Sequence, residues 1–155
     1  MLDRPALLPD APMQPGQLLA RGVARHLRDH DFCCLEEFVP DRGLRIDVMA
    51  MGPKSEFWVI ECKSSRADFM SDLKWRNYLP FADRFFFAVD CDFPTEILPG
   101  DVGLIIGDAF GAEVIRMPEG TPLPQAKRRK LTVRFARTAA QRLHWARDPM
   151  LRSAS

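Results

Sequence analysis

Two carboxylates and one lysine near the middle of the chain have types and spacing that suit catalysis. Asp47 stands in an apolar run, and Glu61 and Lys63 close a second apolar run fourteen and sixteen residues later. Side chains two residues apart on a strand point to the same face, so Glu61 and Lys63 are expected to be neighbours. If the two runs form a hairpin, Asp47 lies opposite Glu61. The pattern predicts a D…ExK centre.

Such a centre suits hydrolysis of a phosphodiester with Mg²⁺. Mg²⁺ takes one or two protein carboxylates and keeps several waters, so Asp47, Glu61 and the backbone carbonyl of Cys62 are the expected ligands, with Mn²⁺ as a substitute ion. Lys63 would orient or help to deprotonate the attacking water, whose pKa the ion lowers. An E-x-K triplet is also common on the wet face of an edge strand. The triplet alone does not distinguish a catalytic centre from an exposed strand face.

Hydrophobic periodicity identifies the elements that must position the trio. It predicts helices over residues 17–29, 68–79 and 132–147, and strands over 32–38, 44–51, 56–64, 84–89, 102–107 and 112–117. Short connections predict an antiparallel meander for the first three strands, and the unbroken apolar run at 84–89 predicts a strand buried on both faces. The order indicates an α/β fold with three layers, a mixed β-sheet flanked by helices.

Length and composition indicate one domain. In the 155-residue chain we expect an extended N-terminal arm over residues 1–16, the domain over 17–148 and a C-terminal tail over 149–155. Four cysteines without a CxxC pair predict free thiols and no structural zinc. No apolar run approaches the length of a membrane span, so we expect no membrane partner and a cytoplasmic location.

The net charge of +1 conceals a segregation of charge along the chain. Residues 126–155 hold 9 basic residues and 1 acidic residue, a balance of +8, which leaves −7 for the rest. The last predicted helix has an apolar side through Val133, Ala136, Ala140, Leu143 and Ala146. We expect six basic residues to contact the DNA backbone, with a targeting signal or a solvated loop as the alternative: Lys127, Arg128, Arg129, Lys130, Arg134 and Arg137.

Three longer segments carry a family resemblance over most of the chain. They are RIDVMAM…FWVIECKSSRADFMSDLKWRNYLPFADRFFFAVD, ILPGDVGLIIGDAFGAEVIR and RRKLTVRFARTAA. These segments resemble the MmcB-type DNA-repair endonucleases of the PD-(D/E)xK nuclease-like superfamily. The resemblance implies a restriction-endonuclease-like core, metal binding by Asp47 and Glu61, a catalytic role for Lys63, and a nucleoid-associated repair enzyme.

The resemblance also bears on residues around the trio. In such folds the helix after the motif lies beside the active site, which makes Asp72, Lys74 and Tyr78 auxiliary candidates; ordinary surface charge and packing is the alternative. Many superfamily members carry a further Glu on the first helix, and the predicted first helix here has none. Glu37, in preference to Glu36, is the candidate substitute. Because the first helix lacks this Glu, a site with one metal ion is favoured over a site with two.

Three functions remain open from the sequence. The first is a Mg²⁺-dependent endonuclease acting on damaged or branched DNA, for which a homodimer would suit double-strand cutting. The second is a nuclease-fold DNA-binding or adaptor protein that recruits other repair proteins and performs no chemistry. The third is a protein-interaction domain that uses the aromatic side chains of Trp58, Phe69 and Trp75.

Overall fold

A six-stranded mixed sheet forms the centre of the computed structural model, which describes residues 12–152. The strands are β1 (Cys33–Phe38), β2 (Ile46–Met51), β3 (Phe57–Cys62), β4 (Arg84–Val89), β5 (Gly103–Gly107) and β6 (Ala112–Arg116). They lie in chain order across the sheet. The first three are antiparallel, β3, β4 and β5 are parallel, and β6 is antiparallel to β5. The predicted strands and mixed sheet are confirmed.

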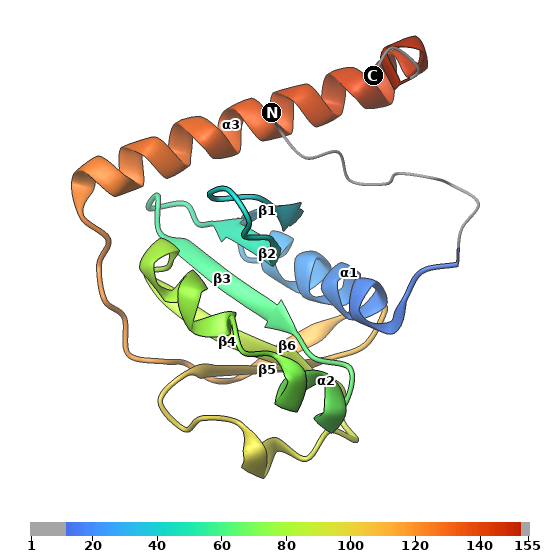
Figure 1. Cartoon of the computed structure of the whole chain (residues 1–155), viewed down its shortest axis with the longest axis vertical. Helices are drawn as coiled ribbons and strands as arrows, with labels where there is room; N and C mark the ends of the chain where they lie inside the picture. The colour runs from blue at the N-terminus through green and yellow to red at the C-terminus, as the bar shows by residue number, and fades with distance from the viewer. Residues whose placement is uncertain (1–11, 153–155) are drawn as a thin grey trace.

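Helices cover both faces of this sheet (Figure 1). The α-helices are α1 (Pro15–Arg28), α2 (Arg66–Ser71) and α3 (Gln125–Arg147), and the 3₁₀ helices of the described residues are η1 (Trp75–Phe81), η2 (Thr95–Ile97) and η3 (Pro149–Arg152). The α1 helix packs on one face, and η1 and the first half of α3 contribute to the core of the other. The α/β fold with a three-layer core is therefore confirmed.

The ends of the predicted domain differ slightly from the structure. The first helix begins at Pro15, two residues early, because proline suits the first turn and Gln14 and Gln17 form a capping box there. Residues 1–11 of the predicted arm lie outside the described residues. In the predicted tail, Pro149–Arg152 forms η3. Within residues 12–152, no helix is long and apolar enough to cross a membrane.

The prediction of one helix over residues 68–79 is wrong. The chain leaves α2 at Asp72, whose backbone is extended, and restarts as η1 at Trp75. The Asp72 carboxylate causes the restart, because its Oδ1 accepts the backbone N–H groups of Lys74 (2.8 Å) and Trp75 (3.1 Å). A side chain that caps the second segment therefore replaces the continuous helical ladder.

The last helix begins seven residues earlier than predicted. Pro124 precedes its first turn, so the basic cluster at 127–130 is helical and not a loop. Its buried residues are Leu131, Phe135 and Thr138, whereas Val133 and Leu143 of the predicted apolar side are 53% and 61% exposed. The helix has two apolar stripes, and periodicity alone does not say which of them packs on the sheet.

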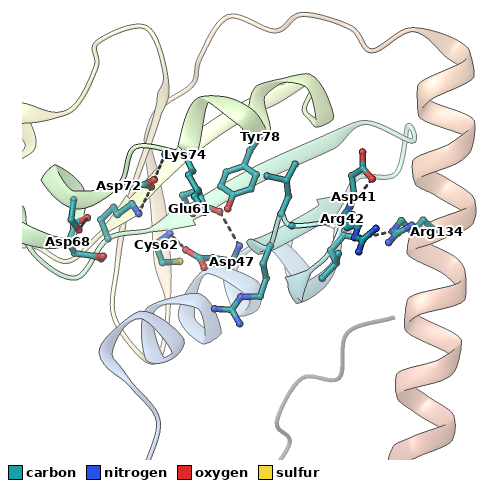
Figure 2. A pocket seen from close by; sticks show the side chains of 16 residues that line it. Asp41, Arg42, Asp47, Glu61, Cys62, Asp68, Asp72, Lys74, Tyr78 and Arg134 are labelled. Carbon is teal, nitrogen blue, oxygen red and sulfur yellow. Dashed lines mark hydrogen bonds and ion pairs between the residues drawn. The ribbon is translucent and has the colours of Figure 1, made fainter. Parts of the chain in front are cut away.

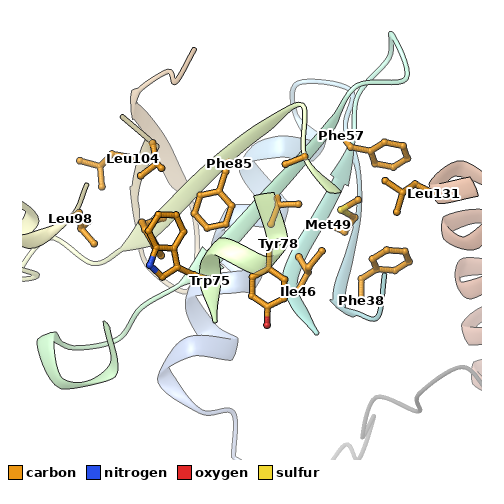
Figure 3. Packing of buried hydrophobic residues seen from close by; sticks show 14 of the residues in the cluster. Phe38, Ile46, Met49, Phe57, Trp75, Tyr78, Phe85, Leu98, Leu104 and Leu131 are labelled. Atoms are coloured by element: carbon orange, nitrogen blue, oxygen red, sulfur yellow. The ribbon is translucent and has the colours of Figure 1, made fainter. Parts of the chain in front are cut away.

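The two faces of the sheet bury two separate hydrophobic clusters. Val48, Ile60 and Phe86 pack with α1, while Phe57 and Phe87 pack with η1 and α3 on the other face (Figure 3). Alternation along β3 places Glu61 on the η1 side of the sheet. All of β4 after Arg84 is buried, as its apolar run predicts.

A single carboxylate fixes the start of α3 against the sheet. Asp83 accepts two hydrogen bonds from Arg128 (2.6 and 2.7 Å) and the backbone N–H groups of Phe57 (2.7 Å) and Leu123 (2.8 Å). Burial opposes ionisation of this carboxyl, but the hydrogen bond from Arg128 and the two backbone hydrogen bonds hold its pKa below the usual range. Arg128 is thus a structural residue that anchors the basic helix.

Candidate active site

A cavity of about 1100 Å³ opens where β2 begins and β3 ends (Figure 2). Asp47 and Glu61 lie on its floor with Cys62 and Lys63. One wall is the loop between β1 and β2, and the other is the α2–η1 region. The remaining lining residues are Val39, Asp41, Arg42, Gly43, Leu44, Arg45, Asp68, Ser71, Asp72, Lys74, Tyr78 and Arg134.

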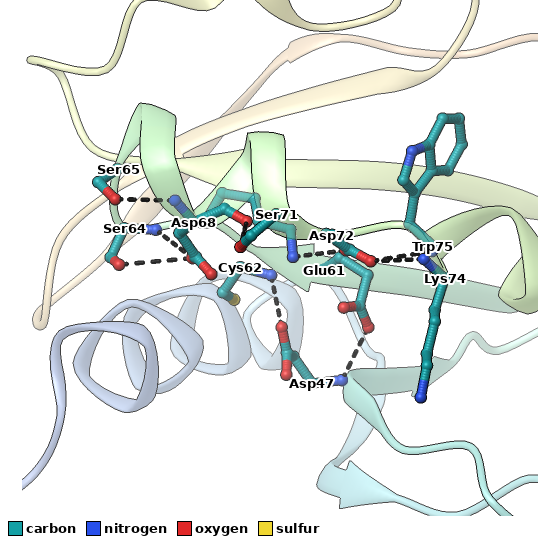
Figure 4. A network of polar contacts seen from close by, with 11 residues as sticks. Asp47, Glu61, Cys62, Ser64, Ser65, Asp68, Ser71, Asp72, Lys74 and Trp75 are labelled. Atoms are coloured by element: carbon teal, nitrogen blue, oxygen red, sulfur yellow. Dashed lines mark hydrogen bonds and ion pairs between the residues drawn. The ribbon is translucent and has the colours of Figure 1, made fainter.

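Asp47 and Glu61 are joined through the backbone of the strands that carry them. The pairing of β2 with β3 ends at Val48 and Ile60. Beyond that pair, the Cys62 N–H donates to Asp47 Oδ2 (2.8 Å) and the Asp47 N–H donates to Glu61 Oε1 (3.1 Å), as Figure 4 shows. The carboxylates thus replace carbonyl groups as acceptors. The structure brings Asp47 and Glu61 together as the predicted hairpin requires.

The two carboxyl groups cannot both carry a charge without a counter-ion. Glu61 is 4% exposed, and burial followed by the negative charge of Asp47 raises its pKa to about 9. Burial also raises the pKa of Asp47, although the Cys62 N–H, the charge of Lys63 and a side-chain hydrogen bond from Glu61 act in the opposite direction. At neutral pH Glu61 therefore retains its proton, and a cation bound by both carboxyl groups would favour their ionised forms.

Lys63 is held as a cation at the edge of this pair. Its backbone N–H donates to the Ala88 carbonyl (2.9 Å), and its Nζ lies 2.6 Å from Asp72 Oδ2. Burial alone would lower the pKa of Lys63, but the hydrogen bond and charge of Asp72, together with Glu61, raise it above the usual value. Of the two predicted roles, orientation of a water is favoured over its deprotonation.

The short helix α2 fixes the chain after Lys63. Ser65 Oγ accepts the N–H of Asp68 (3.1 Å), and Asp68 Oδ2 accepts the N–H of Ser64 (3.0 Å). This reciprocal cap directs the chain away from the sheet and places Asp68 on the cavity wall. Sequence reasoning missed Asp68, although the Ser-x-x-Asp spacing is a recognisable capping signal.

The three auxiliary candidates after the motif all line the cavity. Asp72 pairs with Lys63, and Lys74 is exposed at the rim. Tyr78 is 8% exposed; burial, followed by the charge of Glu61, raises its pKa, while a hydrogen bond from the Arg45 backbone opposes the rise. Arg42 and Arg45, on the opposite wall, were not predicted, because no local pattern marks the loop that brings them there.

The structure does not bring Glu37 into the cavity. Glu37 has a positive φ of 50°, and its carbonyl accepts a hydrogen bond from Arg142 Nη2 (2.8 Å). Glu36 faces a separate groove beside α1. The predicted substitution for a first-helix Glu is therefore not supported by this geometry. Among residues 12–152, no group of three or more His, Cys, Asp or Glu side chains is arranged to hold a metal ion.

The six basic residues predicted to contact DNA have different positions. Arg134 reaches the cavity, and its Nε donates to the Val39 carbonyl (2.6 Å). Arg128 is bound to Asp83, and Lys127 lies 4.3 Å from the centre of the Phe81 ring. The other three are exposed on α3: Arg129, Lys130 and Arg137. All four cysteines are free thiols, but only Cys62 is buried, whereas mostly buried thiols were expected.

Comparison with known proteins identifies the family. A family model described as "DNA repair protein MmcB-like" matches residues 9–150, which is most of the chain. The protein belongs to the MmcB-like family. This membership indicates a role in DNA repair. No curated protein matches the chain significantly.

A solved structure supports the fold of this MmcB-like protein. The SPO1766 protein of unknown function from Silicibacter pomeroyi is 58% identical, with a TM-score of 0.88. The match covers 90% of this chain and 96% of that one.

The raised pKa of Glu61 gives a stability prediction for the protein without divalent ions. Because the folded-state pKa lies above the unfolded value, stability should fall as pH rises from about 4.5 towards about 9. Glu61→Gln is neutral at every pH, so at pH 8 it should raise the free energy of unfolding by roughly 1–3 kcal/mol. Urea denaturation at pH 5 and pH 8 measures the difference.

The exposed Glu113 on β6 gives the matched control, because Glu113→Gln makes the same chemical change at the surface. It should alter stability little at either pH. A Glu61→Gln protein that is no more stable than the wild type at pH 8 would contradict a strained pair in which Glu61 retains its proton.

Proposed function

We propose that the protein is a divalent-metal-dependent endonuclease that hydrolyses phosphodiester bonds of damaged or branched DNA. The observation that carries the proposal is the pair of half-buried Asp47 and buried Glu61 at the floor of the cavity, with a cationic Lys63 beside it. Buried charges of this kind are costly to folding, so a site that retains them calls for a function. Membership of a DNA-repair family supports DNA as the substrate.

The donor set of the cavity fits Mg²⁺, with Mn²⁺ as a substitute. Mg²⁺ binds through one or two carboxylates and keeps several waters. A site with two carboxylates, Asp47 and Glu61, meets this requirement without a third acid. An ion bound by Asp47 and Glu61 would balance both negative charges and displace the proton that the raised pKa of Glu61 otherwise retains. The Cys62 carbonyl, at the end of β3, is the proposed third protein ligand. When bound, the ion would lower the pKa of a water and polarise the phosphoryl group.

The residues of the chain then have distinct roles. Lys63, kept protonated by Asp72, orients the attacking water and balances negative charge that develops on the phosphate. Lys74, Arg42 and Arg45 hold neighbouring phosphates from the two walls of the cavity. Asp72 touches neither water nor phosphate in this scheme; it positions Lys63.

Removal of Lys63 or Asp47 should separate hydrolysis from DNA binding. We expect Lys63→Ala and Asp47→Ala to lower the rate of plasmid nicking with Mn²⁺ by about 10²–10⁴, the range for loss of a positioned catalytic group. DNA affinity should change little, because the other cavity cations remain. Lys54→Ala, in the exposed turn between β2 and β3, is the control and should nick normally. If wild-type protein leaves duplex, mismatched, flap and four-way DNA uncut with either ion, the catalytic proposal fails.

The ion pair of Lys63 with Asp72 predicts a change in pH dependence. In Asp72→Asn the pKa of Lys63 should fall, because burial then acts without the compensating charge. The alkaline limb of the rate against pH should therefore move to lower pH, with a rate loss of about tenfold at pH 8. Single-turnover nicking from pH 6 to pH 10 measures it. A uniform loss with an unmoved alkaline limb would indicate a purely structural role.

A non-catalytic DNA-binding or adaptor role is the second candidate. The observation in its favour is that the Lys63 ammonium group is paired with Asp72, with 2.6 Å between Nζ and Oδ2. An adaptor would bind DNA with a steep dependence on salt and show no turnover with any divalent ion.

A further inference from the structure

The two longest helices of the protein carry basic residues and no acidic ones. α1 has 3 arginines and α3 has 8 lysines and arginines, and neither contains any of the 21 acidic residues of the chain. The remaining 11 basic residues therefore share the rest of the chain with all 21 acids. A solvated helix commonly mixes both signs, so this separation calls for a physical cause.

Helix stability does not explain the separation. Like charges three or four residues apart repel, as Arg21 with Arg25 and Lys130 with Arg134 must. The helix dipole favours cations in the last turn of α1, but it disfavours the four cations at 127–130, which lie at the positive end of α3. An anionic partner would relieve both kinds of repulsion.

Both helices border the outer strand β1 (Figure 1). From α3, Arg134 Nε donates to the Val39 carbonyl (2.6 Å) and Arg142 Nη1 donates to the Glu36 carbonyl (2.5 Å). From the opposite face, α1 packs against β1 and β2. The cationic helices thus flank one edge of the sheet, and β1 lies between them.

A groove of about 520 Å³ lies between α1 and β1. Arg21, Arg25 and Arg28 line it from one face of α1, since their spacing of four and three residues brings them into one row. Arg21 is engaged, because its Nε donates to the Ala109 carbonyl (2.9 Å). Arg25 and Arg28 are exposed. The other lining residues are Ala24, Phe32, Cys33, Cys34 and Glu36.

The groove lies close to the catalytic cavity along β1. Glu36 lines the groove, and Val39, three residues further along the chain, lines the cavity. A DNA strand that passes over this edge of the sheet can contact both sites. On the cavity side of this edge, Arg134 adds a cation from α3, and its Nε donates to the Val39 carbonyl.

We propose that the α1–β1 groove is a second DNA-backbone site, in which Arg25 and Arg28 bind phosphates while the cavity holds the scissile one. The inference rests on the proposed function for the cavity. The substrate would then be DNA long enough to cross the β1 edge, either a bent duplex or a branched DNA with a second arm.

The test removes two charges and measures binding without catalysis. Arg25→Gln/Arg28→Gln keeps side-chain length and helix propensity. Fluorescence anisotropy with a 30-base-pair duplex and a four-way junction, in EDTA and from 50 to 300 mM salt, gives affinity and its salt dependence. We expect affinity to fall about tenfold at 100 mM salt and the slope of log K against log salt to fall by about 2, one for each lost phosphate contact.

Two controls separate the groove from general effects. Lys54→Gln removes one charge from the exposed β2–β3 turn and should leave affinity and slope nearly unchanged. Arg25→Lys/Arg28→Lys keeps the charges and should retain the salt slope, and a matching circular dichroism spectrum shows that each variant is folded.

The outcomes also distinguish this inference from the proposed function. If the Arg25→Gln/Arg28→Gln protein has the DNA affinity and the salt dependence of the wild type, the proposed DNA site in the groove is wrong, whether or not the protein cuts DNA. A wild-type protein that never cuts DNA, combined with a reduced slope in this variant, overturns the catalytic proposal and leaves the groove as a binding site.

Discussion

At the end of the β2–β3 pair, backbone N–H groups donate to side-chain carboxylates in place of backbone carbonyl groups. The site depends on this one constraint. Asp47 accepts from Cys62, and Glu61 accepts from Asp47. Each acid therefore belongs to the strand framework as much as to the cavity. The fold fixes two carboxyl groups side by side before any ligand arrives, and the cost of that placement appears in the raised pKa of Glu61.

The surrounding elements limit that cost and define the cavity. Asp72 supplies the counter-charge for Lys63 and, through its second oxygen, the cap that starts η1. One carboxylate thus couples the geometry of Lys63 to the break between α2 and η1. On the other side of the sheet edge, Asp83 and Arg128 anchor α3, so that Arg134 reaches the rim.

Sequence patterns predicted the features that depend on local alternation. Glu61 and Asp47 meet because strand period and hairpin pairing are short-range properties, and the buried β4 follows from its composition alone. The failures involve one local capping interaction and one long-range packing choice. Asp72 ends a helix because its carboxylate finds N–H donors ahead of it, and α3 buries Leu131 in place of Val133 because the sheet selects one of two apolar stripes. Neither choice is encoded in periodicity.

The central proposal is that a divalent cation, bound by Asp47 and Glu61, replaces the proton that Glu61 otherwise retains. Titration calorimetry of Mn²⁺ into the protein at pH 7.5, repeated in buffers of different ionisation enthalpy, counts the protons released on binding. The account predicts binding with release of about one proton per ion, because the pKa of Glu61 lies above the pH of the experiment. Absence of Mn²⁺ binding, or binding with no proton release, would contradict it.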